Sequence, residues 1–197
     1  MVASVNIKKD ETIFSEVALV SCQFSWNKTY GYLSCDLCMS PLETAEENVR
    51  RLAFDETIVL PYSELDPVAH VQQNFVSCEN CSTKYCSKEC LSTANKLYHN
   101  VMCGRYDEIN EKWKTIHYPP ETSTIMIIVR IFAMLKSQSV PNLMEKLNEF
   151  SCRSINEDIS LCHKMLGEKF QDQISDLHKT ILQAFQDDEA TVAPRVT

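Results

Sequence analysis

The residues with the clearest chemistry are cysteines and one histidine that recur in close pairs. Between Cys78 and Cys103 the spacing is C-x2-C-x4-C-x3-C-x8-H-x3-C, which places six potential metal ligands within twenty-six residues. Zn²⁺ takes four sulfur or nitrogen ligands in a tetrahedron, and these ligands usually come in such pairs. A C-x2-C pair directs two thiolates at one ion from a tight turn, and residues four apart share a helix face. The spacing therefore predicts zinc binding.

A further pair of ligands is required, because six are too many for one zinc ion and too few for two closed sites. Cys35 and Cys38 supply it as another C-x2-C motif. We predict eight ligands, which are Cys35, Cys38, Cys78, Cys81, Cys86, Cys90, His99 and Cys103. Thirty-nine residues separate Cys38 from Cys78, so His70 stays open as a substitute ligand, although we expect it at the surface. Buried or disulfide-bonded cysteines are the alternative, but random burial does not explain paired spacing.

The order of the four pairs predicts a cross-braced arrangement, in which alternate pairs share an ion. The first and third pairs form one site, and these are Cys35, Cys38, Cys86 and Cys90. The second and fourth pairs form the other site, and these are Cys78, Cys81, His99 and Cys103. Protein atoms fill every coordination position, so both ions would be structural rather than catalytic. Their binding free energy would fold a segment too small to fold alone.

The composition is that of an acidic globular protein. The chain has 197 residues, of which 44% are apolar, and a formal net charge of −8. It stays acidic with two Zn²⁺ added, because seven thiolates carry more charge than the ions bring, so we expect no general nucleic-acid binding. Residues 125–135 form the most apolar run, but they are too few to span a bilayer and include Arg130. No membrane association is expected.

Residues outside the pairs are assigned no chemistry. The amino-terminus lacks the basic and apolar regions of a signal peptide, so we expect a nuclear or cytoplasmic protein that is not secreted. Clustered cysteines in such a reducing compartment are metal ligands rather than disulfides. Core positions are expected for the remaining cysteines, which are Cys22, Cys152 and Cys162. His117 and His163 are expected to be packing or surface residues rather than ligands. No catalytic triad or other catalytic residue is recognised.

The elements that must position the ligands are strands first and helices later. Residues 4–26 are rich in β-branched and aromatic residues, which predicts strands. Residues 42–54 predict an amphipathic helix, and the prolines of 55–68 predict a loop. Ser87 predicts a helix N-cap that places Cys90 in the first turn. Further helices are predicted over 106–116, 121–137 (buried on most sides), 142–151, 156–168 and 169–186. Residues 187–197 are expected to be disordered.

The cysteine-rich segment resembles the MYND zinc finger. The resemblance lies in C-x2-C at 78–81, in Tyr-Cys-Ser-x2-Cys at 85–90, and in the final His-x3-Cys. The flanking segments 11–14, 23–27, 45–48, 116–122 and 163–167 are similar to the SET and MYND domain-containing family. This resemblance extends from about residue 7 to residue 186.

The resemblance implies a protein-lysine N-methyltransferase that uses S-adenosylmethionine on histone or other protein lysines. The implied fold class is α+β, with short SET-type strands, a cross-braced MYND finger and a mostly helical insert. The expected boundaries are 1–34 for the first part of a split SET domain, 35–103 for the finger (core 78–103), 104–186 for the helical region and 187–197 for the tail.

The sequence departs from the family in its catalytic motifs. It has no Asn-His dipeptide and no Gly-Glu-Glu element, and its three glycines lie in no cofactor-binding motif. We therefore expect the amino-terminal portion of such an enzyme, which is catalytically incomplete alone and binds S-adenosylmethionine only as part of a full-length protein. The alternative is a zinc-stabilised MYND adaptor that docks a partner peptide in a groove near Tyr85 and Leu97. The expected partner is a protein or a lysine-containing protein substrate.

Overall fold

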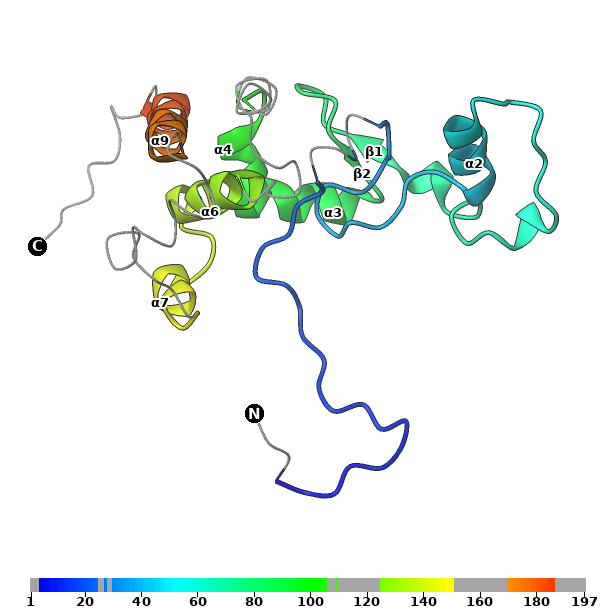
Figure 1. The fold of residues 1–197 in the computed structure, drawn as a ribbon, viewed down its shortest axis with the longest axis horizontal. Coiled ribbons are helices and arrows are strands. Elements are labelled where there is room, and N and C mark those ends of the chain that lie inside the picture. Colours follow the sequence, from blue (N-terminus) through cyan, green and yellow to red (C-terminus); the bar gives the residue numbers. More distant parts are fainter. Residues whose placement is uncertain are drawn as a thin grey trace, which may run out of the picture.

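The computed structural model describes residues 4–24, 27, 30–105, 109, 125–150 and 170–186 of the chain. Within these ranges the fold is mixed but mostly helical, with one short sheet. The elements in chain order are α2 (Ala45–Ala53), η1 (Ser63–Leu65), η2 (Gln72–Asn74), β1 (Val76–Ser77), β2 (Lys84–Tyr85), α3 (Lys88–Ala94), η3 (Asn95–His99), α4 (Asn100–Met102), α6 (Ile125–Ser137), α7 (Leu143–Asn148) and α9 (Phe170–Gln186). Figure 1 shows α2, β1, β2 and α3 towards one end of the molecule and α6, α7 and α9 towards the other.

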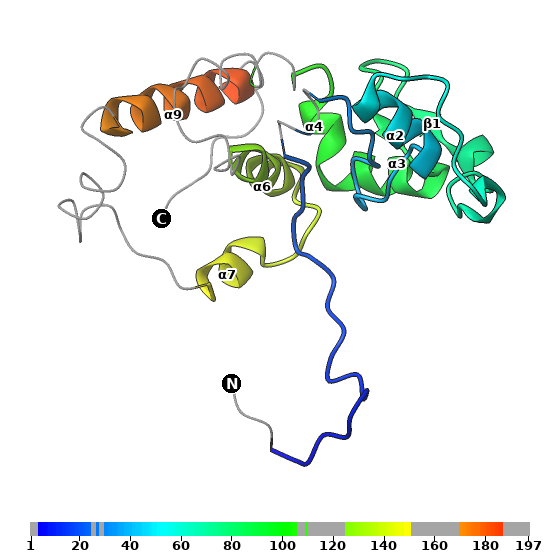
Figure 2. The same ribbon diagram turned by 45° about the vertical axis from the view of Figure 1, so that its right-hand side comes forward.

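The strands predicted over residues 4–26 are wrong for the part that the structure describes. Residues 6–8 and 11–18 form no regular secondary structure and pair with no strand, and Val17 is 91% exposed. The segment extends away from the helices in both views (Figures 1 and 2). β-Branched residues favour a strand only when a neighbouring strand accepts their hydrogen bonds and covers one face, and the described ranges contain no such neighbour.

The observed sheet instead flanks the ligand pair Cys78 and Cys81, with β1 just before this pair and β2 just after it. β1 and β2 pair antiparallel, with Val76 opposite Tyr85 and Ser77 opposite Lys84. The loop predicted over 55–68 is present, with η1 inside it, and η2 follows it just before the sheet. This loop folds back on α2, because the amide of Leu60 donates to Glu46 and the guanidinium of Arg50 donates to the carbonyl of Ile58.

The helix predicted over 42–54 is confirmed as α2. Its start is a capping box, in which the amide of Glu47 donates to the hydroxyl of Thr44 and the Glu47 carboxylate accepts from the amide of Thr44. Its end is Phe54, which adopts a left-handed conformation with φ of 53°. The helix buries no residue, so its local caps and charges contribute much of its stability.

The carboxyl-terminal helices are confirmed where they can be described. The 121–137 helix is present as α6, and the 142–151 and 169–186 helices are present as α7 and α9. Burial of α6 on most sides is confirmed, because its exposed residues are confined to one stripe formed by Ile128 and Phe132, which are 38% and 40% exposed. The predicted helices 106–116 and 156–168, and the predicted disordered tail 187–197, lie outside the described residues, apart from buried Ile109.

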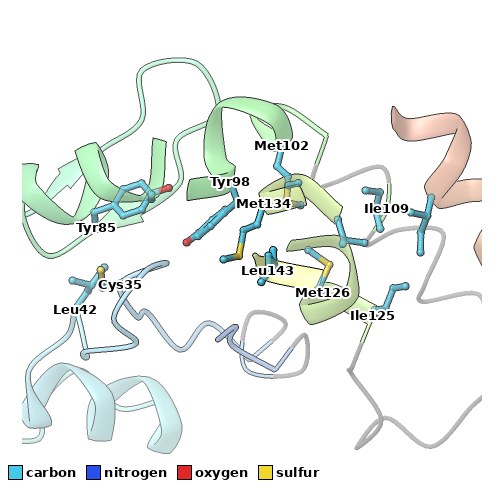
Figure 3. Close-up of a cluster of buried hydrophobic side chains, with 14 residues drawn as sticks. Cys35, Leu42, Tyr85, Tyr98, Met102, Ile109, Ile125, Met126, Met134 and Leu143 are labelled. Atoms are coloured by element: carbon cyan, nitrogen blue, oxygen red, sulfur yellow. The ribbon is translucent and has the colours of Figure 1, made fainter. Parts of the chain in front are cut away.

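The hydrophobic core joins the two ends of the molecule. Tyr98 and Met102 pack with Met134 of α6, and the cluster continues to Cys35 beside the sheet (Figure 3). The cysteine-rich segment and α6 therefore share one core. Within the described ranges, no helix combines the length and hydropathy that a membrane crossing requires.

Replacing Thr44 by Ala removes the hydroxyl that caps α2. Loss of an N-cap costs about 1 kcal/mol, which corresponds to roughly fivefold faster opening of the first turn. Native-state hydrogen exchange should show this acceleration at the amides of Glu47 and Asn48. Thr180→Ala is the matched control, because that hydroxyl donates to the carbonyl of Asp176 within α9 and caps nothing. Unchanged exchange of α2 in Thr44→Ala would contradict the capping role.

Candidate metal centres

The first group of ligands is built on a turn that the sheet holds in place. Cys35 donates its amide to the carbonyl of Ser40 and accepts from the amide of Met39, which closes the turn that carries Cys35 and Cys38. The amide of Asp36 in this turn donates to the carbonyl of Lys84 in β2. The turn is thereby fixed beside the end of β2, which is directly followed by Cys86.

The other half of this group comes from β2 and α3. Ser87 is the predicted N-cap, and its hydroxyl accepts from the amide of Cys90. The sulfurs of Cys86 and Cys90 are 3.5 Å apart, and the sulfurs of Cys38 and Cys86 are 3.6 Å apart. The four ligand atoms of Cys35, Cys38, Cys86 and Cys90 all lie within 4.8 Å of one another.

The second group joins the sheet to the end of the long helical segment. Cys78 and Cys81 lie in the turn between β1 and β2, where Cys78 donates its amide to the carbonyl of Thr83. His99 and Cys103 are four residues apart, and the amide of Cys103 donates to the carbonyl of His99. The sulfurs of Cys78 and Cys103 are 3.7 Å apart, and the sulfur of Cys81 is 3.5 Å from Nε2 of His99. These four ligand atoms also lie within 4.8 Å of one another.

The distances in both groups fit tetrahedral zinc. Zn–S bonds of about 2.3 Å and Zn–N bonds of about 2.0 Å imply tetrahedron edges of about 3.8 Å between sulfurs and about 3.5 Å between sulfur and nitrogen. The observed contacts of 3.5–3.7 Å between ligand atoms are close to these edges. A disulfide would require a separation of about 2.05 Å, and all the described cysteines are free. Both groups could therefore bind a zinc ion.

His99 is held by packing on a wide helical turn. It is 1% exposed, and its ring meets the ring of Tyr85 edge to face at 5.7 Å. Among the described residues Nδ1 of His99 has no hydrogen-bond partner, so the Tyr85 ring and the thiol beside Nε2 set its orientation. η3 is a π-helical turn, a feature that often marks functional positions in helices. The carbonyl of Leu97 in this turn accepts from the hydroxyls of Ser137 and Ser139.

The thiols of the first group differ in acidity. Burial opposes ionisation of Cys38, but hydrogen bonds from Ser40 and neighbouring thiols outweigh it and lower the pKa of Cys38 to about 7. Burial raises the pKa of Cys86, and hydrogen bonding to Cys90 and Cys38 raises it further. One thiol of the group can therefore ionise easily while its neighbour retains a proton, because hydrogen bonds stabilise the thiolate of Cys38 and burial opposes a charge on Cys86.

The second group repeats this pattern. The hydrogen bond with His99 lowers the pKa of Cys78 to about 6, although burial opposes it. Burial, followed by hydrogen bonding to Cys81 and Cys78, raises the pKa of Cys103 to about 12. A divalent cation replaces the retained protons in such a group, so metal binding releases protons.

The remaining predicted residues are not brought into either group. His70 is exposed, as expected, and belongs to neither group. Burial raises the pKa of Cys22, which packs against the core as predicted. The prediction that Tyr85 lines a peptide groove is wrong, because Tyr85 is fully buried in the core. Four residues lie outside the described part of the chain, and these are Cys152, Cys162, His117 and His163.

The contact that anchors the first turn was not predicted from the sequence. Arg130 of α6 is 2% exposed and pairs with Asp36, which lies between Cys35 and Cys38. The available signal was one arginine in the apolar run 125–135, since a buried cation needs a buried acceptor. Nothing in the local sequence indicated which acceptor that would be.

Known proteins similar to this chain carry one shared name. This chain is 37% identical over 191 residues to "Protein-lysine N-trimethyltransferase SMYD5" of Danio rerio. The match covers 92% of this chain and 46% of that protein. The proteins of the same name from Homo sapiens and Gallus gallus are 38% and 36% identical over 193 and 197 residues, covering 92% and 95% of this chain. The chain spans about half the length of these curated relatives, 46% in each case. No family model and no solved structure matches it.

The thiol acidities predict how metal affinity depends on pH. Cys103 and Cys86 keep their protons near neutrality, so each bound zinc ion should displace at least one proton. The logarithm of the zinc association constant should therefore rise by at least one per pH unit between pH 7 and 8. The slope should steepen below about pH 7 and pH 6, where Cys38 and Cys78 also protonate. Competition titration against a chelator at several pH values measures these slopes. An affinity that does not change between pH 7 and 8 would contradict the protonation pattern.

Proposed function

We propose, because this chain belongs to the SET and MYND domain-containing family as a relative of the SMYD5 proteins, that it forms the zinc-binding portion of a protein-lysine N-methyltransferase. The observation that carries the proposal is the pair of ligand groups, each with four Cys or His atoms within 4.8 Å. The names of its relatives support the methyltransferase assignment and imply that the substrate is a protein lysine. We further propose that residues 1–34 are the first part of a split SET domain, that residues 35–103 form a MYND finger, and that residues 104–186 form a helical region.

The two ions would be structural. Four protein ligands complete each tetrahedron, which leaves no coordination position for a substrate. The groups interleave along the sequence, so zinc would tie the turn at Cys35, the hairpin of β1 and β2, and the helix that carries His99 into one unit. Eight free thiols among the described residues are compatible with a reducing compartment, and we place the protein in the nucleus or cytoplasm.

Methyl transfer itself is not assigned to residues of this chain. S-adenosylmethionine would supply an electrophilic methyl group to a lysine amine in the full-length enzyme. The sequence lacks the Asn-His and Gly-Glu-Glu elements that the family resemblance implies for this step. The role that we propose for this chain is therefore to build a rigid zinc-containing surface beside the catalytic part.

Elemental analysis of the purified chain should give two zinc ions per molecule. Cys78→Ser should reduce this value to about one, because three remaining ligands bind zinc much less tightly and the first group stays complete. Cys22→Ser is the matched control and should retain both ions, since Cys22 is a free cysteine that belongs to neither group. A wild-type chain that binds no zinc would remove the basis of the proposal.

Methyl transfer from labelled S-adenosylmethionine to lysine-containing proteins should require a full-length family member. The 197-residue chain alone should transfer no label above background, while the full-length protein should be active. Labelling of any lysine peptide by the chain alone would show that the transferase site lies within these residues.

A further inference from the structure

The turn that carries Cys35 and Cys38 is gripped from outside the cysteine-rich segment. Arg130 donates through one guanidinium nitrogen to the carbonyl of Asp36 at 2.8 Å, and through the other to the Asp36 carboxylate at 2.5 Å. The first nitrogen also donates to the carbonyl of Ser21. The Ser21 hydroxyl in turn donates to the carbonyl of Leu37 at 3.3 Å. Arg130 thus fixes both the backbone and the side chain of a residue between two ligands.

Tyr98 completes this cluster from the side of the second group. Its hydroxyl donates to the carbonyl of Asp36 at 2.9 Å and to the Asp36 carboxylate at 3.1 Å. Its ring lies 4.6 Å from the guanidinium carbon of Arg130, and Figure 3 shows it pointing towards the segment that carries Cys35. Tyr98 directly precedes His99 in the chain. The buried Tyr98 and Arg130 therefore form a cluster with the half-buried Asp36, the Asp36 cluster, which connects the turn of the first group to the helical turn of the second.

We propose that Arg130 is a positioning residue of the first metal site, acting through Asp36 on the turn that presents Cys35 and Cys38. This inference rests on the proposed zinc binding. A guanidinium presents several donors in a rigid planar fork, so it can hold a carbonyl and a carboxylate in one orientation. Fixing these two groups stops the turn from rotating and keeps both sulfurs aimed at the ion. Metal then binds to a preformed pair of ligands rather than to a mobile turn.

The effect should be confined to the first site. His99 is held by the ring of Tyr85, and the η3 turn is held by Ser137 and Ser139 at the end of α6. The Arg130 guanidinium takes part in none of these contacts; it meets η3 at the ring of Tyr98, whose hydroxyl can still donate to Asp36 when Arg130 is removed. Removal of Arg130 should therefore loosen one metal site and spare the other, whereas an arginine that only stabilises the fold would affect both sites alike.

The same helix supplies a matched control. Lys136 is also a cation on α6, but its ammonium donates to the carbonyl of Phe185 and lies 6.0 Å from the Phe185 ring of α9. Lys136→Met therefore removes a positive charge and a hydrogen bond from α6 without touching the Asp36 cluster.

The experiment measures zinc release to an excess of chelator from wild type, Arg130→Met and Lys136→Met. Contacts that orient metal ligands typically change metal affinity by about 10- to 100-fold, so one of the two ions should leave Arg130→Met faster by roughly that factor. Iodoacetamide labelling with peptide mass spectrometry then assigns the site. In Arg130→Met, alkylation should reach the cysteines of the first group, Cys35, Cys38, Cys86 and Cys90, before those of the second group, Cys78, Cys81 and Cys103. Lys136→Met should match wild type.

Wild-type release rates for both ions in Arg130→Met, or equal acceleration of both, would overturn the inference. If Arg130→Met does not fold, Arg130→Lys keeps the charge but cannot hold the carbonyl and carboxylate together, and it should still speed release from the first site alone. Wild-type release in Arg130→Lys would then overturn it. A wild-type chain with fewer than two ions would instead contradict the proposed function, which separates the two failures.

Discussion

The structure depends on bringing seven sulfurs and one imidazole into two groups in which every ligand atom lies within 4.8 Å of the others. Such packing is unfavourable for thiolates alone, because like charges at this distance repel. The thiol pKa values differ accordingly: the hydrogen bond with His99 lowers the pKa of Cys78 to about 6, whereas burial and the neighbouring thiols raise the pKa of Cys103 to about 12. Two divalent cations remove the conflict, since each replaces retained protons and attracts all of its ligands.

This constraint explains why segments far apart in sequence form one unit. The first group joins the turn at Cys35 to β2 and α3, and the second joins the hairpin to the end of the helical segment. Arg130 extends the connection across the predicted boundary between residues 35–103 and 104–186, because it pairs with Asp36. Removing one partner of a buried ion pair costs about 3–5 kcal/mol, a large fraction of the roughly 5–15 kcal/mol that stabilises a typical domain. The cysteine-rich segment and the helices should therefore unfold together.

Local patterns predicted the elements that depend on local physics. The capped helix at Ala45–Ala53 and the N-cap at Ser87 follow from short-range hydrogen bonds, so they were readable from the sequence. Close ligand pairs are similarly local, and the structure brings the same eight side chains together in the same two groups, although metal binding by them stays a prediction. The strands predicted over 4–26 failed because a strand needs a partner that no local pattern specifies. The Arg130–Asp36 pair was missed for a related reason, since its members are ninety-four positions apart.

The central claim is that two closed centres with sulfur-rich coordination organise this chain. X-ray absorption at the zinc edge of the purified protein tests it most directly, because it counts the atoms bound to the metal and measures their distances. The account predicts sulfur at about 2.3 Å as the dominant neighbour, with a minor nitrogen contribution, because seven sulfurs and one ring nitrogen are divided between two ions. A first shell dominated by oxygen or nitrogen would contradict it.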